Sequence, residues 1–201
     1  MNKKIHRVLV IENQCIDVNK LSRQILKNEP KIIKKYPPTG ADGVYTDGNT
    51  GLGSNSLTSR FYHFNVLKWW GTKVLRKEIR RGYEIYSGVK NKPLYVQCWA
   101  NVMRKGEQIR SHIHCPDAVL PQHALSGHLN VQVDEVCSTY YDDEALLNKN
   151  RQLVIFPIHL PHHTDQYMGD GERITVAFDI FSEEFFKYDV SKDAQKHWIR
   201  I

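Results

Sequence analysis

Histidines and one arginine in the second half of the chain have spacings that could hold a metal ion beside an anion. The first cluster is His112–Ile113–His114, and the second, about fifty residues later, includes His162. Arg173 follows eleven residues beyond His162 and opens an alternating run. Two imidazoles and a third ligand from a distant strand can form a three-sided metal site that leaves positions open for substrate or oxygen.

The first cluster depends on strand geometry. Residues two apart on a strand point to the same face, so His112 and His114 can converge on one ion. The usual site of this kind has two histidines and one carboxylate, whereas this chain has His114 where the carboxylate would stand. Asp117, which lies beyond Pro116, is the alternative second ligand.

The second cluster follows an apolar strand that Pro157 ends. A histidine at a strand end facing the mouth of a barrel is well placed as third ligand, which favours His162. His159 and His163 are the rivals. His163 would face away from His162 in an extended backbone, and His159 is better suited to supporting the turn.

Arg173 and Thr175 are also two residues apart and share one face of a predicted strand. A guanidinium offers a fork of donors that matches a carboxylate, and the threonine hydroxyl adds a hydrogen bond. A salt bridge from Arg173 to Glu172 or Asp179 is the structural alternative. The opposite face of this strand carries apolar residues: Ile174, Val176 and Phe178.

Alternating runs without intervening helices predict the fold. Their ranges are 94–103, 128–133, 151–156 and 173–181, with an earlier strand at 5–12. Consecutive strands of this kind favour a mostly β fold with flanking helices, a double-stranded β-helix (jelly-roll, cupin-like) barrel. We expect one domain over residues 1–201, with the jelly-roll catalytic core at 94–181 and an N-terminal strand, helices and long loop at 1–90.

The N-terminal half predicts two helices. Asp17 caps the first, which Pro30 should end, and a loop rich in glycine, proline and asparagine follows at 31–56. The second covers 65–86. Its apolar face should contain Leu67, Trp70, Val74, Leu75 and Ile79, and its basic face Lys73, Arg76, Lys77, Arg80 and Arg81.

Composition and charge bear on the partners and the cellular location that can be expected for this protein. The 201 residues carry a net charge of +6, which is compatible with a nucleic-acid partner but does not indicate one. The sequence predicts no membrane span and no signal peptide, so we expect a cytoplasmic protein, and a homodimer is compatible with the sequence. The four cysteines lack CxxC spacing and are expected to be free thiols: Cys15, Cys98, Cys115 and Cys137.

Taken together, the motifs resemble a family of iron(II)/2-oxoglutarate-dependent dioxygenases, the 2OG-Fe(II) oxygenases of bacteria and phages. The resemblance covers roughly residues 94–181. It rests on Trp99–Ala100–Asn101, His112–Ile113–His114–Cys115–Pro116, Ser126–Gly127, Phe156–Pro157 with Leu160–Pro161–His162, and Arg173–Ile174–Thr175 with Phe178–Asp179. The chain departs from the family where Cys115 separates His114 from Pro116.

The resemblance implies His112, His114 and His162 at iron, Arg173 and Thr175 on 2-oxoglutarate, and Asn101 inside the barrel near that cosubstrate. It further implies a hydroxylase that uses molecular oxygen on an unidentified primary substrate.

After Ser126–Gly127 the family often has tyrosines, whereas this chain has His128, Leu129 and Asn130. Tyr95 is the candidate replacement for those tyrosines.

Two other classes fit parts of the pattern. Gly106 and the His112–His114 pair match the start of a cupin motif, which predicts a metal enzyme that needs no 2-oxoglutarate. A non-enzymatic jelly-roll binding module with structural histidines is the other. Neither alternative requires a carboxylate-binding Arg173.

Overall fold

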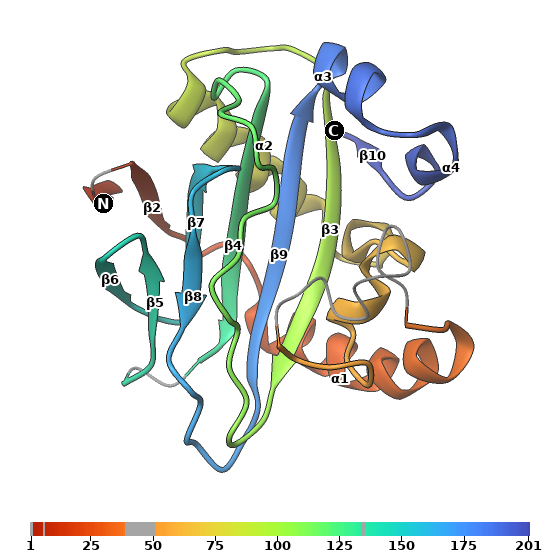
Figure 1. Cartoon of the computed structure of the whole chain (residues 1–201), viewed down its shortest axis with the longest axis vertical. Helices are drawn as coiled ribbons and strands as arrows, with labels where there is room; N and C mark the ends of the chain where they lie inside the picture. Colours follow the sequence, from red (N-terminus) through yellow and green to blue (C-terminus); the bar gives the residue numbers. More distant parts are fainter. Residues whose placement is uncertain (1, 6, 39–50, 134–135) are drawn as a thin grey trace.

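The computed structural model describes residues 2–5, 7–38, 51–133 and 136–201. Within them, two antiparallel sheets face each other, and helices cover the outer side of the larger one (Figure 1). The predicted mostly β jelly-roll class with flanking helices is confirmed.

The larger sheet has the strand order β1-β2-β7-β4-β9-β3-β10. Its strands are β1 (Asn2–Ile5), β2 (Val8–Glu12), β3 (Leu94–Met103), β4 (Ala124–Gln132), β7 (Gln152–Pro157), β9 (Arg173–Ser182) and β10 (Ile199–Arg200). The smaller sheet has the order β6-β5-β8, with β5 (Ser138–Tyr141), β6 (Glu144–Leu147) and β8 (His162–Thr164). The N-terminal strands therefore extend the sheet formed by the second half of the chain.

Strand β9 is an inner strand of the larger sheet, next to its middle strand β4. It pairs with β3 on one side, where Thr175 lies opposite Asn101, and with β4 on the other, where Asp179 lies opposite Ser126. Both neighbours are antiparallel, so side chains of all three strands alternate between the same two faces. One face can then form a core while the other forms a site.

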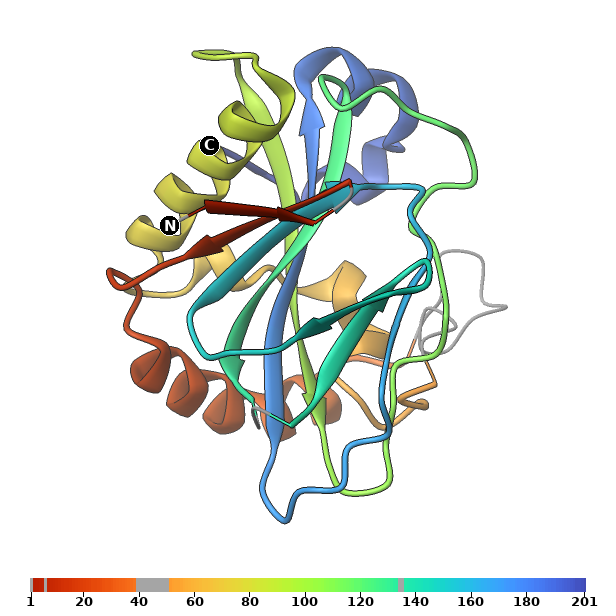
Figure 2. The same ribbon diagram turned by 90° about the vertical axis from the view of Figure 1, so that its left-hand side faces the viewer.

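Helices fill the outer face. They are α1 (Val18–Lys35) and α2 (Lys73–Ser87). Two short 3₁₀ helices, η1 (Thr58–His63) and η2 (Val66–Lys68), lie between α1 and α2 in the sequence. Figure 2 shows α1 and α2 on the side of the large sheet that faces away from β5 and β6. Ile25 of α1, Ile79 of α2 and Val176 of β9 are fully buried in one shared core. The chain ends with α3 (Glu183–Asp189), α4 (Lys192–Gln195) and β10.

The first helix runs further than predicted. Asp17 caps α1 by accepting from the Lys20 backbone N–H, as expected, but the helix continues through Pro30 to Lys35. A proline inside a helix costs about 3 kcal/mol. Two interactions offset that cost. Ile32 packs against the core, and Arg104 donates two hydrogen bonds, of 3.0 and 2.8 Å, to the buried Glu29 carboxylate.

The prediction of a loop at 31–56 is therefore wrong at its start, because residues 31–35 are helical. Residues 39–50 of that loop lie outside the described residues.

The second helix begins later than predicted, and part of its assigned apolar face is wrong. Gly71 has φ +86°, a left-handed conformation that interrupts a helix, and α2 starts at Lys73. Trp70 therefore precedes the helix and is 75% exposed, and Val74 is exposed too. Leu75, Ile79 and Tyr83 form the buried face.

Among the strands, the predicted range 94–103 matches β3, and the others agree within a few residues. The strand predicted at 5–12 is instead two strands joined at Arg7, whose φ is +66°. The short β5, β6 and β8 were not predicted. Within the described residues none of the four cysteines forms a disulfide, as expected. None of the described helices is both long and apolar enough to cross a membrane.

Gly127 provides a test of how closely the sheet packs. A Cβ there would lie 2.4 Å from the Val154 carbonyl oxygen and 2.5 Å from a Phe178 ring carbon. We expect Gly127→Ala to lower the free energy of unfolding by about 1–3 kcal/mol, the usual cost of overpacking. Urea denaturation measures it. Gly171→Ala is the matched control, because nothing lies within 4 Å of its Cβ position; equal stability of the two variants would contradict this packing.

Candidate active site

A cavity of about 850 Å³ lies between the two sheets. The inner face of β9 contributes Arg173, Thr175 and Asp179 to its wall, and η1 closes part of it with Thr58 and Phe61. The predicted strand parity is confirmed, because Ile174, Val176 and Phe178 belong to the helix-side core instead.

The segment that carries His112 and His114 is not the predicted strand. It makes a single antiparallel bridge, with reciprocal backbone hydrogen bonds of 3.2 and 3.1 Å between His112 and His162. The His114 N–H then donates to the Ile158 carbonyl at 3.1 Å. These few bonds fix the pair beside β8 even though no continuous ladder forms.

The structure brings His112, His114 and His162 together. One ring nitrogen from each lies within 4.8 Å of the others, and among the described residues this is the only group of three or more potential metal-ligating side chains.

The hydrogen bonds of each ring indicate which nitrogen carries the proton. Nδ1 of His112 lies 2.8 Å from the Arg110 carbonyl, and Nδ1 of His162 lies 2.9 Å from the Leu160 carbonyl. A carbonyl oxygen can only accept, so each Nδ1 must donate. The lone pair of a neutral ring then lies on Nε2, the nitrogen left to bind a metal.

His114 follows the same pattern through a side chain. Its Nδ1 lies 2.6 Å from Asp179 Oδ1, and Ser126 Oγ donates to the same carboxylate oxygen at 2.6 Å. Its Nε2 is then 3.3 Å from Nε2 of His112. When both rings are neutral, the lone pairs of these two Nε2 atoms face each other, and a cation between them would stabilise the arrangement. The donor set therefore fits a divalent metal such as iron(II).

Burial supports the neutral form of His162. Desolvation, reinforced by the electrostatic influence of the neighbouring His112 and His114 rings, holds the pKa of this imidazole well below its ordinary value. His162 therefore presents an unprotonated nitrogen at neutral pH, as metal binding requires.

The rival ligands lie elsewhere. Asp117 is exposed and outside the histidine cluster. His159 bonds through Nε2 to an Arg7 guanidinium nitrogen at 2.8 Å, and the His163 ring stacks on Tyr140 with centroids 4.8 Å apart. His163 thus faces away from His162, as parity predicted.

Arg173 is 1% exposed and lies within the cavity wall. One guanidinium nitrogen donates to Thr139 Oγ1 at 3.0 Å and another contacts the Met103 sulfur at 3.6 Å. Nε has no hydrogen-bond partner, and no carboxylate pairs with Arg173 among the described residues. Burial lowers the pKa of this guanidinium. A buried cation without an anion is costly, so this end of the cavity favours an anionic ligand.

Thr175 and Asn101 lie next to each other across the β3–β9 pair. Asn101 Nδ2 donates to Thr175 Oγ1 at 3.4 Å, and its Oδ1 accepts from Thr58 Oγ1 at 2.7 Å. Both residues line the cavity, as expected for Asn101 inside the barrel.

His128 and Tyr141 are a buried pair that the sequence alone did not single out as cavity residues. The Tyr141 hydroxyl lies 3.4 Å from His128 Nδ1. Burial, with a smaller effect from Arg173, lowers the pKa of His128 to about 3, so the ring is neutral. His128 lines the cavity, and its Nε2 has no partner among the described residues.

Tyr95, the predicted replacement for the family's tyrosines, is not in the cavity wall. Its ring stacks on Phe186 with centroids 3.9 Å apart, near the other end of β3 from Asn101. Tyr141, which belongs to the unpredicted strand β5, and Tyr167 are the phenols that lie close enough to Arg173 to act on its charge.

Comparison with solved structures shows the same fold in 2-oxoglutarate-dependent oxygenases. The viral collagen prolyl hydroxylase of Paramecium bursaria Chlorella virus-1 superposes with a TM-score of 0.54 at 12% identity, covering 88% of this chain and 96% of that one. The carbocyclase SnoK of nogalamycin biosynthesis gives 0.59 at 11% identity, with 92% and 87% covered. A Pseudomonas putida prolyl-4-hydroxylase gives 0.51 at 12%, with 89% and 94% covered.

No protein-family model matches the sequence, and no curated protein matches it either. The similarity therefore lies in the fold.

The histidine cluster predicts one divalent metal ion per chain. We expect His162→Ala to weaken cobalt(II) or iron(II) binding more than about 100-fold, beyond the range typical of residues that only orient a ligand. Anaerobic titration calorimetry measures this. His159→Ala and His163→Ala are the controls and should bind metal normally; if either lost the metal while His162→Ala retained it, the assignment would be wrong.

Asp179 should hold His114 in its metal-binding orientation. Asp179→Asn keeps the shape of the side chain but removes its charge, so we expect metal affinity to fall about 10–100-fold with little loss of stability. Asp117→Asn is the matched control for the loss of one carboxylate. Normal metal affinity in Asp179→Asn together with a loss in Asp117→Asn would make Asp117 the ligand.

Proposed function

We propose that this protein is an iron(II)- and 2-oxoglutarate-dependent dioxygenase that hydroxylates a primary substrate not yet identified. One cavity combines three converging imidazoles with a buried arginine that pairs with no carboxylate among the described residues, and this combination supports the proposal. A metal enzyme that uses no 2-oxoglutarate would have no need of such an arginine.

In this proposal His112, His114 and His162 hold iron(II) through their Nε2 atoms. The three protein ligands leave coordination positions for the keto-acid end of 2-oxoglutarate and for molecular oxygen. Together, bound iron and cosubstrate supply the oxidation: oxygen is consumed, 2-oxoglutarate becomes succinate and CO₂, and one oxygen atom enters a substrate C–H bond as hydroxyl.

Arg173 would bind the far carboxylate of 2-oxoglutarate, assisted by the Thr175 hydroxyl. The anion would supply the partner that Arg173 Nε lacks among the described residues. Thr139, already bonded to one nitrogen of Arg173, limits the directions in which the guanidinium can turn. Asn101 and Thr58 keep the Thr175 hydroxyl in place through their hydrogen bonds.

Hydrogen-bond acceptors next to the three histidines orient their rings. The Arg110 and Leu160 carbonyls and the Asp179 carboxylate each hold one Nδ1 proton, which turns the other nitrogen of each ring toward the common point. Asp179 has a second effect. His114 stands where the usual site has a carboxylate ligand, and Asp179 places a negative charge one hydrogen bond behind it.

Arg173→Ala tests the cosubstrate assignment. Loss of a buried, hydrogen-bonded charge pair costs about 2–5 kcal/mol, so we expect 2-oxoglutarate binding to weaken at least about 30-fold. Metal content should be unchanged, because no histidine of the cluster bonds to Arg173. Binding is measured by calorimetry on the cobalt(II) protein, and wild-type protein should form succinate only with iron(II), oxygen and 2-oxoglutarate together.

Two outcomes would contradict the proposal. Equal loss of metal and of 2-oxoglutarate in Arg173→Ala would indicate a structural role for Arg173. Unchanged 2-oxoglutarate affinity would place the cosubstrate carboxylate elsewhere.

A further inference from the structure

Helix α1 carries nearly all of the net positive charge of the protein. It contains six basic side chains and one glutamate, a net charge of +5, in a chain whose total is +6. The single glutamate, Glu29, is buried and paired with Arg104. Every charged side chain on the exposed part of this helix is therefore basic.

The basic residues form one stripe. At 100° per residue, all six fall within about 60° of the direction of Lys20, and the buried residues of α1 occupy the opposite side. We call this set the α1 stripe: Lys20, Arg23, Lys27, Lys31, Lys34 and Lys35. At a rise of about 1.5 Å per residue it extends for about 22 Å.

The stripe contains unrelieved repulsion. Arg23, Lys27, Lys31 and Lys35 follow one another at four-residue spacing, and like charges at this spacing destabilise a helix. Within the described part of the chain, none of these four pairs with a carboxylate. Such an arrangement is favourable when a polyanion lies along the helix.

An exposed aromatic ring stands at the start of the stripe. Trp70 is 75% exposed, Lys20 Nζ lies 3.4 Å from the centre of its ring, and Gln24 Nε2 donates to its carbonyl at 3.2 Å. Two contacts from α1 thus hold the indole beside the basic residues. A fixed, exposed indole in line with cations is the combination that binds unstacked bases and their phosphates.

We propose that the α1 stripe and Trp70 form a docking surface for single-stranded nucleic acid. An anionic membrane is the less favoured partner, because membrane-bound amphipathic helices insert their apolar face, and Leu21 and Ile25 of α1 are already buried in the core. A duplex would use the cations but would leave Trp70 without an unstacked base.

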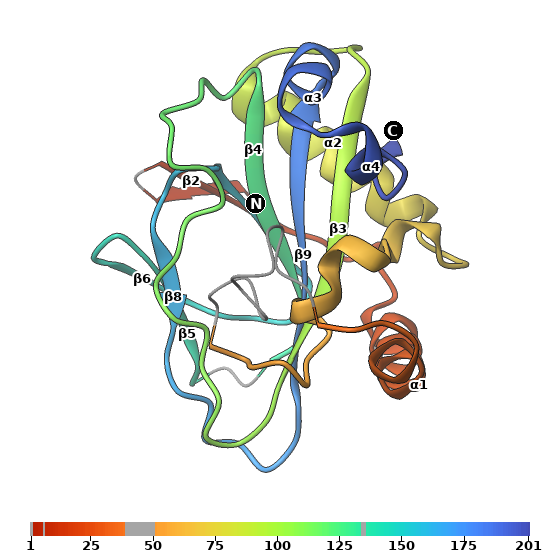
Figure 3. The same ribbon diagram turned by 45° about the vertical axis from the view of Figure 1, so that its right-hand side comes forward.

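The surface is separate from the cavity. Figure 3 shows α1 on the opposite side of the large sheet from β5 and β8, which help to line the cavity. Nucleic acid bound to α1 would leave the cavity open, whatever reaction takes place there.

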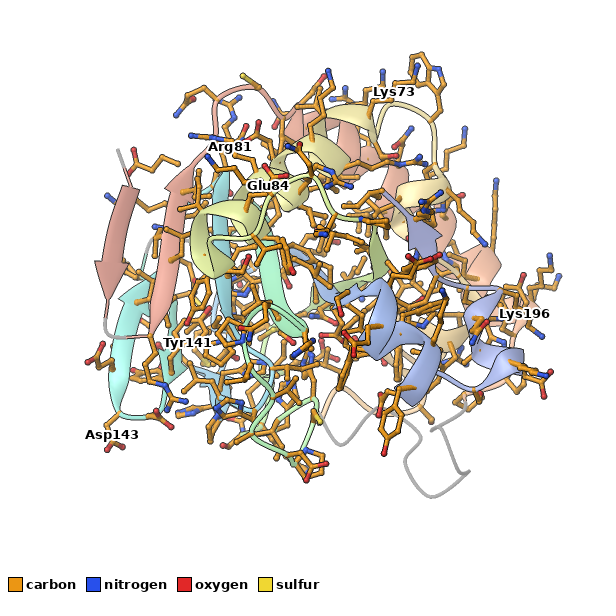
Figure 4. The ribbon with its side chains drawn as sticks, turned by 90° about the horizontal axis from the view of Figure 1, so that it is seen from above. Lys73, Arg81, Glu84, Tyr141, Asp143 and Lys196 are labelled. Atoms are coloured by element: carbon orange, nitrogen blue, oxygen red, sulfur yellow. The ribbon has the colours of Figure 1, made fainter. Side chains whose placement is uncertain are left out.

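The test measures binding of a fluorescein-labelled oligothymidylate by anisotropy at several salt concentrations. The charge-reversed variant is Lys27→Glu with Lys31→Glu. The matched control is Lys73→Glu with Lys77→Glu on α2, which removes the same charge from another exposed helix; Figure 4 shows Lys73 on the outer side of α2. Lys27→Gln with Lys31→Gln repeats the test at half the charge change, in case the reversed pair does not fold.

We expect the α1 variant to weaken binding at least about tenfold and the α2 control less than about threefold. The salt slope should fall by about 1.4 in the α1 variant, from two lost phosphate contacts at about 0.7 each. Trp70→Ala should weaken binding at least about fivefold, the lower limit for loss of one stacked base. 2-Oxoglutarate affinity should stay unchanged in all three.

Equal losses in the α1 and α2 variants would overturn the proposal, because they would show a response to net charge alone. An unchanged affinity in Trp70→Ala would also overturn it. Phosphatidylserine vesicles provide the third arm: tighter binding to vesicles than to the oligonucleotide, lost in the α1 variant, would identify a membrane partner instead.

Discussion

The alternation of side chains along β9 is the constraint on which both halves of the structure depend. Its residues Ile174, Val176 and Phe178 face the helices and lie in the main core. The residues between them face the other sheet, where Arg173 and Thr175 line the cavity and Asp179 holds His114. Because one inner strand carries both sets, packing against α1 and α2 fixes the positions of the polar groups on its far face.

The chemistry of the site follows from the hydrogen bonds that the three imidazoles make through Nδ1, the ring nitrogen that points away from the metal position. Three neutral histidines leave the charge of a divalent ion uncompensated, unlike a set with one carboxylate. This chain places Asp179 behind His114 and leaves the anion of Arg173 to be supplied by a ligand. A dicarboxylate cosubstrate would therefore balance both the metal and the arginine.

Much of this site could be predicted because strand parity and motif spacing are local properties. Arg173, Thr175 and Asn101 fall where the period of two puts them. The tautomers could not be predicted, because they depend on carbonyls brought close by irregular turns. The assignment of Trp70 to a helix face failed because periodicity does not show where a helix begins, and the left-handed Gly71 sets that point. Tyr141 and Thr139 lie on a strand of four residues, too short to leave a clear pattern.

The proposed function requires that one end of the cavity bind a keto acid at iron while Arg173 binds a second carboxylate. The most direct measurement is an anaerobic titration of the iron(II) protein, following the visible metal-to-ligand absorption band, with 2-oxoglutarate and with pyruvate, which lacks the second carboxylate. We predict that 2-oxoglutarate produces the band at one equivalent and binds at least about 30-fold more tightly than pyruvate, the effect of one buried charge pair. Equal affinities for the two acids, or no band with either, would contradict this mode of binding.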